Sequence, residues 1–119
     1  IKVGADSQLL ATGQRNGGEV LVGGSWQNSD PTVRQATQTW MQQGSVVDAS
    51  STGAGDGGTV VIWSDLSKPS GGTVAQGSLL ARGGEASGNG GRIETSGRFL
   101  VAEPERLDVS SANGRAGTW

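Results

Sequence analysis

Apolar and polar residues alternate in short stretches along this chain, and similar stretches recur as repeated units. Alternation with a period of two is the signature of a half-buried β-strand, and no segment shows helical periodicity. Two strand types repeat, each with an inward and an outward set of positions. The inward set of the first type is Leu9, Val47, Leu79 and Leu107; that of the second is Val20, Val60 and Ile93, followed two residues later by Val22 and Ile62. Alternation places Val61, beside Val60, on the outward face.

An Asx-Gly-Gly tripeptide precedes each strand of the second type. The copies are Asn16-Gly17-Gly18, Asp56-Gly57-Gly58 and Asn89-Gly90-Gly91, which begin 40 and 33 residues apart. A pair of glycines indicates a sharp corner at which the backbone takes positive φ. We therefore expect Asn16, Asp56 and Asn89 at one corner of the fold, stacked as a ladder of Asx side chains.

The register between the second and third units is ambiguous by one residue. An offset of 33 aligns Gly-Ser pairs but stacks Ala49 on Arg82, whereas an offset of 32 stacks Val47 on Leu79 and Ala49 on Ala81. A slip of one residue exchanges the two faces of a strand and would bury an unpaired arginine. The sequence therefore favours an offset of 32, with the extra residue in the following loop.

One unit cannot bury its own inward residues, so the units must stack. The sequence predicts an all-β fold, a right-handed parallel β-helix with about three strands per coil and roughly four coils, the last incomplete. Residues 73–75 and 99–101 supply the third strand of two units. Residues 27–43 are polar and rich in Gln and Thr, so we expect them to form a lateral excursion from the first coil. We interpret residues 1–119 as a single solenoid segment, a fragment of a longer repeat protein.

Composition narrows the range of functions. Gly accounts for 22 of 119 residues and only 33% are hydrophobic, which suits a narrow core and argues against a helical bundle. The net charge of −2 gives no electrostatic basis for binding nucleic acid. The apolar runs are far shorter than the roughly 20 residues that span a bilayer, so no membrane insertion is expected.

The sequence also lacks the usual means of catalysis and metal binding. Cys and His are absent, which excludes a thiolate nucleophile and the commonest general base and metal ligand. The Gly-rich loops are not followed by Gly-Lys-Ser/Thr, as a phosphate-binding loop requires. Asp48 and Asp108 are expected two coils apart on an outward face, too far apart to act as a pair. We therefore predict no catalysis, no metal and no cofactor.

The tryptophans are the candidate binding residues. Trp63 follows the inward Ile62, so it points outward or to a corner, where it is a candidate platform for stacking on a sugar or protein. The alternative is that Trp63 packs under the excursion. We take Trp63, Trp26, Trp40 and Arg92 as the predicted binding residues.

Several segments resemble a family of bacterial exoproteins. The segments are Gly-Gly-Thr-Val-Val-Ile-Trp-Ser-Asp (57–65), Ala-Arg-Gly-Gly (81–84), Gly-Asn-Gly-Gly-Arg-Ile-Glu-Thr-Ser-Gly (88–97) and Asn-Gly-Arg-Ala-Gly-Thr (113–118). Their ordered set resembles the filamentous-haemagglutinin-like adhesins exported by two-partner secretion. The resemblance implies a β-helical shaft at the surface of a Gram-negative bacterium, exported through an outer-membrane transporter, with a role in adhesion or biofilm.

These observations lead to one expected function and two alternatives. We expect a structural, non-enzymatic segment of a secreted surface adhesin or filament, in contact with neighbouring coils or identical subunits. The first alternative is a carbohydrate- or receptor-binding module whose partners are host or matrix glycans. The second is a self-assembling fibre subunit that stacks through the open ends of the solenoid.

Overall fold

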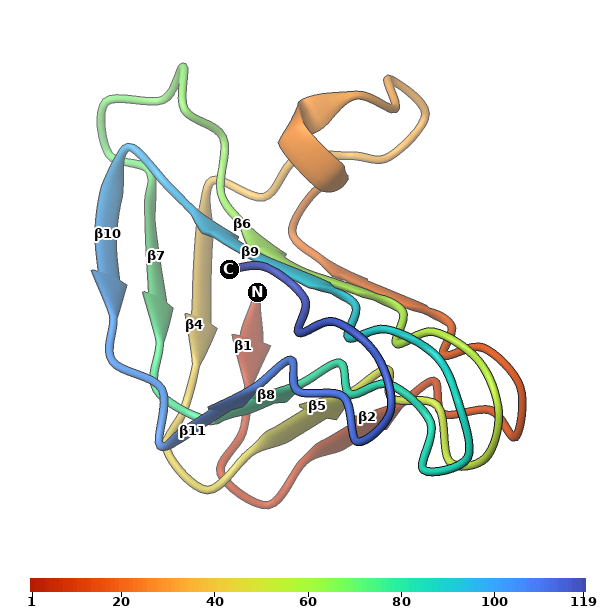
Figure 1. Ribbon diagram of the computed structural model, residues 1–119. Coiled ribbons are helices and arrows are strands. Elements are labelled where there is room, and N and C mark those ends of the chain that lie inside the picture. Colours follow the sequence, from red (N-terminus) through yellow and green to blue (C-terminus); the bar gives the residue numbers. More distant parts are fainter.

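The computed structural model describes residues 1–119 and consists of short β-strands with one turn of 3-10 helix, η1 (Trp26–Asn28) (Figure 1). The strands are β1 (Lys2–Val3), β2 (Gln8–Leu10), β3 (Glu19–Val22), β4 (Gln38–Met41), β5 (Val46–Asp48), β6 (Thr59–Trp63), β7 (Gly72–Ala75), β8 (Ser78–Leu80), β9 (Arg92–Ser96), β10 (Phe99–Ala102) and β11 (Arg106–Asp108). No helix in the structure is long or apolar enough to cross a membrane.

Three parallel sheets form the sides of the solenoid. Sheet A has the order β1-β4-β7-β10, sheet B the order β11-β8-β5-β2, and sheet C the order β3-β6-β9. Each sheet takes every third strand, so the chain visits A, B and C in turn and then begins the next coil. In Figure 1 the path runs anticlockwise while it advances from the distant β1 toward the viewer, which is a right-handed winding. The predicted parallel β-helix with three strands per coil is confirmed.

The pairing register matches the offset expected between the second and third units. Val47 pairs with Leu79, 32 residues later, and Val60 pairs with Ile93. Beyond the strand, Ala54 pairs with Ser87, 33 residues later, so the loop between the strands holds the extra residue. The register follows from burial, because the chosen alignment keeps apolar side chains on the inner face in every coil.

The core is a narrow stack of apolar side chains between the three sheets. Val47, Leu79, Val60, Ile62, Ile93 and Val22, all predicted for the core, belong to one buried cluster with Val3, Met41, Ala49, Ala75 and Ala81. Leu9, Val20 and Leu107 pack against this cluster from the first and last coils and are partly exposed there. A core this thin explains how a chain with few bulky residues folds at all.

The predicted excursion over 27–43 is too long at its C-terminal end. Gln38–Met41 form β4, which lies in sheet A between β1 and β7. Thr39 and Met41 point inward and are buried, whereas Trp40 points outward. The other inward residue of this strand is Thr39, and one inward methionine was too weak a pattern to identify the strand from sequence. The segment that leaves the solenoid is residues 23–37, here called the arm.

The solenoid is wider than it is long. Four layers at about 4.8 Å per layer cover only about 14 Å along the axis, and the principal extents of the chain are 45 × 29 × 18 Å. Each coil therefore uses some thirty residues to advance the axis by one strand spacing.

Candidate functional site

The corner before sheet C carries a continuous hydrogen-bonded ladder. The side-chain oxygen of Asn16 accepts the backbone N–H of Asp56 at 3.0 Å, and that of Asp56 accepts the N–H of Asn89 at 2.8 Å. Asn89 continues the series by accepting the N–H of Arg115 at 2.9 Å. The predicted Asx ladder is therefore present, and each of its side chains joins one coil to the next.

The Gly pairs are required for a different reason from the one predicted. Positive φ occurs at Gly23, Gly44, Gly55 and Gly88, and at none of the glycines of the Asx-Gly-Gly tripeptides. The glycine pairs lie where the backbone before a strand of sheet C contacts the backbone after the strand of sheet B in the same coil. In the second coil the N–H of Gly58 donates to the carbonyl of Ala49 at 2.7 Å, and a Cβ on Gly58 would lie 1.9 Å from the carbonyl oxygen of Gly18.

The same contact recurs in every coil and forms a neck in the cross-section. Each second glycine donates to the residue two positions after the inward residue of sheet B, at 2.7 Å in all four coils. The donor and acceptor pairs are Gly18 and Ala11, Gly58 and Ala49, Gly91 and Ala81, and Gly117 and Val109. A Cβ at these positions would collide with the backbone of a neighbouring coil, as on Gly58 with Gly18 and on Gly57 with Ala81, so the close stacking of coils at the neck accounts for the glycine repeat.

Trp63 is not the exposed platform that the sequence suggested. Alternation does point it outward, but its side chain is 4% exposed because the arm lies on it. Its indole Nε1–H donates to Oε1 of Gln35 at 2.9 Å, and a Cβ on Gly24 would collide with its ring. Val61, on the same outward face, is likewise fully buried. The alternative that Trp63 packs under the excursion is correct.

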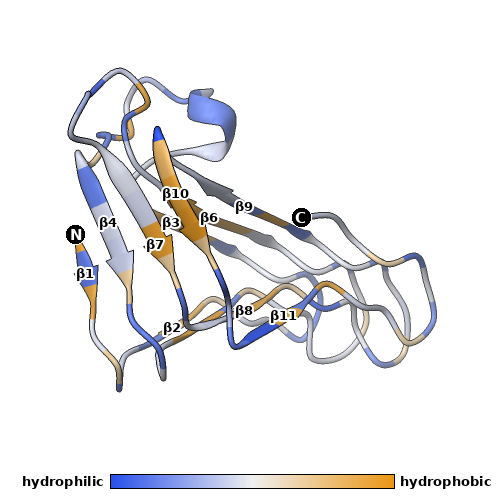
Figure 2. Ribbon diagram, turned by 90° about the vertical axis from the view of Figure 1, so that its left-hand side faces the viewer, coloured by the Kyte–Doolittle hydropathy of each residue, from blue (hydrophilic) through white to orange (hydrophobic).

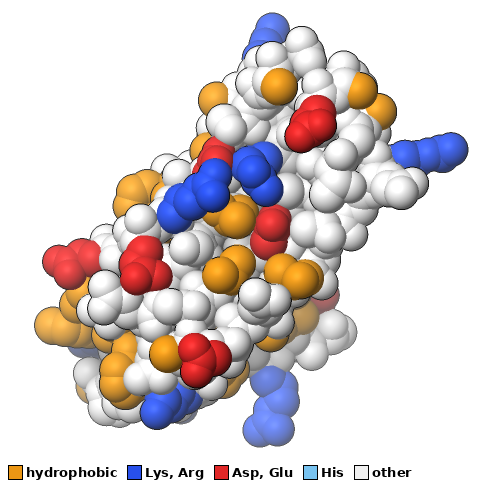
Figure 3. Space-filling view, turned by 90° about the horizontal axis from the view of Figure 1, so that it is seen from below, with side chains coloured by type: hydrophobic (Ala, Val, Ile, Leu, Met, Phe, Trp, Pro, Cys, Tyr) orange, Lys and Arg blue, Asp and Glu red, His pale blue; other side chains and the backbone are white.

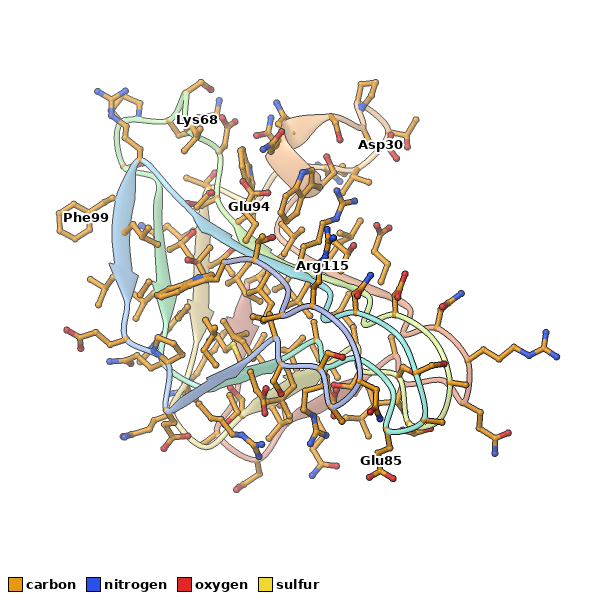
Figure 4. All side chains as sticks on the ribbon, viewed as in Figure 1. Asp30, Lys68, Glu85, Glu94, Phe99 and Arg115 are labelled. Atoms are coloured by element: carbon orange, nitrogen blue, oxygen red, sulfur yellow. The ribbon has the colours of Figure 1, made fainter.

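The arm is fastened to the outer face of sheet C at several points. The N–H of Ala36 donates to the carbonyl of Gly23 and closes the base of the arm at 2.9 Å. In η1 the N–H of Gln27 donates to the Glu94 carboxylate at 2.7 Å. Figure 4 shows Glu94 directly beneath the arm. The outward side chains of β6 therefore form a second buried layer outside the main core.

Trp26 and Arg92, two further candidates, contact each other. The Arg92 guanidinium lies over the Trp26 ring, 4.2 Å from the ring centroid, and its Nε–H donates to Thr59 at 2.9 Å. A cation stacked on an aromatic face is worth about 0.5–1 kcal/mol at an exposed site. The structure thus uses this pair to hold the arm on the sheet, and Trp26 is only partly accessible.

Trp40 is the one predicted tryptophan that faces solvent on a sheet. It is 44% exposed on the outer face of sheet A, and the Lys2 ammonium lies 5.4 Å from its ring centroid. A groove of about 440 Å³ beside it is lined by Trp40, Val74, Phe99, Gln38 and the 69–72 loop. Phe99 is 71% exposed and projects away from β10 in Figure 4.

Sequence reasoning did not find Phe99, Gln38 or Gly72 as neighbours of Trp40. Their proximity depends on the pairing of β4 with β7 and of β7 with β10, in which Gln38, Gly72 and Phe99 share one row. Alternation in the sequence does indicate that Phe99 points outward. Its position relative to Trp40, however, follows only once β4 is recognised as a strand of sheet A. The four predicted binding residues therefore separate into a buried one, an arm contact pair and an exposed groove residue.

The acidic residues on sheet B are paired with cations. Asp48 and Asp108 lie on either side of Leu80 in one outward row. Asp108 contacts Arg106 at 2.8 Å, and Asp48 lies 4.0 Å from Arg82. Figure 3 shows acidic and basic side chains interspersed with hydrophobic ones on this lower face.

Hydrogen bonds keep the Asp108 carboxylate ionised. Bonds from Ser110, with the Arg106 contact, lower its pKa against a partial desolvation that raises it. No three acidic side chains gather in a way that would hold a metal ion. The row is therefore a charge-balanced surface.

Comparisons with known proteins add no identity. No family model matches the sequence, and the search of curated proteins also gives no match. The adhesin function that the resemblance of the repeated segments implies is therefore a proposal.

Proposed function

We propose that this chain is a non-catalytic structural segment of a secreted bacterial surface adhesin or filament. The observation that carries the proposal is that the residues that recur from unit to unit bond to one another. The Asx ladder, the first glycine of each pair, as in Gly57 N–H to the Asn89 carbonyl, and the inward apolar residues join one coil to the next, and the second glycines close each coil. A repeat whose recurring residues join successive coils has a mechanical role, because it builds a stiff cross-section that can be extended by adding coils.

The cellular part of the proposal rests on the resemblance to filamentous-haemagglutinin-like exoproteins. In that setting the chain is exported unfolded through an outer-membrane transporter and folds coil by coil outside the cell. Addition of each coil to a preceding one needs only nearest-neighbour contacts, which suits folding during export. The partners of the segment are then the coils on either side of it.

Surface labelling of intact cells tests this function. Antibodies raised against the purified chain are applied to intact and to permeabilised cells of the organism that encodes it. We expect label on intact cells and its loss after mild external proteolysis or disruption of the outer-membrane transporter. Label confined to permeabilised cells would refute export.

A mechanical readout tests the structural role separately. An in-frame deletion of one whole coil, residues 46–77, should shorten the protein by one strand spacing and leave export intact. Deletion of half a coil should prevent folding beyond that point, because the sheets would no longer be in register. Equal surface exposure of the two deletion variants would argue against a stacked-coil role.

A second candidate function is assembly of fibres through the ends of the solenoid. The outer strands β1, β2 and β3 at one end and β10 and β11 at the other pair on one side only, and the last coil leaves Leu100 and Trp119 exposed by 43% and 60%. Unpaired parallel edges of matching shape favour head-to-tail stacking. Concentration-dependent filaments under the electron microscope would support this candidate, and a monomer at all concentrations would exclude it.

A further inference from the structure

The outer face of sheet A holds two exposed aromatic rings at the margins of one groove. Figure 2 shows this face toward the viewer, with the hydrophobic colouring concentrated in β7 and β10. Trp40 on β4 pairs with Val74, whereas Phe99 on β10 pairs with Gly72, two strands apart and two residues along. Standard sheet spacings put their Cα atoms about 12 Å apart.

The floor between the two rings has no side chain. Gly72 lies in the row between Gln38 and Phe99, so the groove reaches the backbone of β7 there. Its margin carries the Gln38 amide, whose Nε2–H donates to the carbonyl of Ser70 at 3.1 Å, and Pro69 of the same loop. The surface thus combines flat apolar faces with neutral hydrogen-bonding groups.

We propose that this groove, here called the Trp40–Phe99 groove, binds a neutral oligosaccharide. The apolar C–H face of a pyranose ring stacks on an aromatic ring, and its equatorial hydroxyls reach an amide or a backbone carbonyl beside it. Two platforms about 12 Å apart fit two sugars of a linear chain that have one further sugar between them. The proposal adds a binding activity to the structural role and does not depend on it.

The charge of the groove selects this class of ligand. None of its nine lining residues is acidic or basic. A phosphate, sulfate or uronate would lose its hydration without gaining a cationic partner in the groove, which is unfavourable. The nearby Lys2 ammonium already faces the Trp40 ring at the margin. Neutral sugars have no such desolvation cost.

The sheet explains why sugar binding at this place needs no moving part. Trp40 and Phe99 stand on strands that both pair with β7, so backbone hydrogen bonds set the spacing of their Cα atoms. A platform fixed before binding avoids the entropy of ordering side chains on association. Binding should then be weak for one sugar and stronger for a chain that reaches both rings.

Titration of the ¹⁵N-labelled chain with oligosaccharides tests the proposal. The four tryptophans give four indole N–H signals, which single-tryptophan variants assign. The probes are cellotetraose, chitotetraose and maltotetraose, with a heparin hexasaccharide and a proline-rich peptide as competitors of different chemistry. We expect the Trp40 signal to move with at least one neutral tetrasaccharide while the signals of Trp63 and Trp26 stay in place.

Three variants separate the groove from the rest of the surface. Phe99→Ala removes one platform and should weaken binding about tenfold. Gly72→Val fills the floor, where a Cβ would lie 3.3 Å from the Phe99 carbonyl oxygen, so the neighbouring strand must shift by a few tenths of an ångström to admit it. Leu10→Ala, at an equally exposed apolar residue on sheet B, is the matched control and should bind like the wild type.

Each outcome decides the proposal. Binding that is weakened in Phe99→Ala and Gly72→Val but unchanged in Leu10→Ala supports it. No response to any neutral tetrasaccharide overturns it, as does tighter binding of heparin or of the peptide. Equal binding by the folded Phe99→Ala chain also overturns it, since the signal would then arise elsewhere. Dispersed amide spectra of each variant show that it is folded.

Discussion

Gly57→Ala is the substitution that best tests how the coils are packed. An ideal Cβ on Gly57 would lie 2.2 Å from the carbonyl oxygen of Ala81 and 2.6 Å from the nitrogen of Gly91, both in the next coil. Real Cβ atoms almost never approach within 3.0 Å of another atom. The two coils must therefore separate by most of an ångström at the neck to admit one methyl group.

That separation weakens two short backbone hydrogen bonds. They run from Gly57 N–H to the Asn89 carbonyl at 2.8 Å and from Arg92 N–H to the Gly58 carbonyl at 2.9 Å. Each is worth about 1 kcal/mol, and partial loss of van der Waals contact adds to this. Alanine also lowers the conformational entropy of the unfolded chain, which stabilises the folded state by about 0.4–1 kcal/mol and offsets part of this loss. The net destabilisation should be about 2 kcal/mol, or a fall in Tm of roughly 8 °C for a domain of this size.

Urea and thermal unfolding followed by circular dichroism in the β-sheet region measure this effect. Gly4→Ala is the matched control, because a Cβ there meets nothing within 3.6 Å, and its stability should change by less than about 0.5 kcal/mol. If Gly57→Ala is as stable as Gly4→Ala, the neck is not a close contact and the explanation of the glycine repeat is wrong.

Three further predictions concern the ladder, the second buried layer and pH. Asp56→Ala should cost about 1 kcal/mol in urea unfolding, because the next coil loses a hydrogen-bond acceptor; unchanged stability would mean that solvent replaces the bond freely. Val61→Asp should unfold the chain as fully as Val60→Asp, since both valines are buried and an unpaired buried charge costs several kcal/mol; a native-like NMR spectrum of Val61→Asp would show that the arm does not cover this face. Hydrogen bonds from Ser110 lower the folded-state pKa of Asp108, so the unfolded chain binds more protons as pH falls. The Asp108 contribution should be complete above about pH 4, decline as pH falls through the folded-state pKa, and be absent in Asp108→Asn; parallel pH profiles of the two proteins would contradict it.

The inner faces of the strands could be predicted because the pattern is local and repeated. A residue such as Val60 has apolar equivalents in the coils on both sides, and alternation alone assigns it to the core. The ladder at Asp56 was predictable for the same reason, because one residue type recurs at one corner. Repetition makes the fold insensitive to the exact length of the loops.

Features that do not repeat required the tertiary structure. The arm occurs once, so no second copy showed that it folds back over Val61 and Trp63 and buries an outward face. Met41 is the only apolar residue at an inward position of β4, and only the pairing of β4 within sheet A reveals it as core. Alternation therefore predicted correctly that Trp63 points outward, but it did not predict that the arm buries this side chain.

The sequence alone determined the winding of this protein, because stacked apolar columns and recurring Asx-Gly-Gly tripeptides admit one register in which no charge is buried. Only the tertiary structure decided what the glycines do and which aromatic rings meet solvent. Close approach of two backbones at the neck, and the meeting of Trp40 with Phe99 across three strands, depend on residues some thirty to sixty positions apart. Such proximity is a property of the stacked coils and leaves no trace in any one of them.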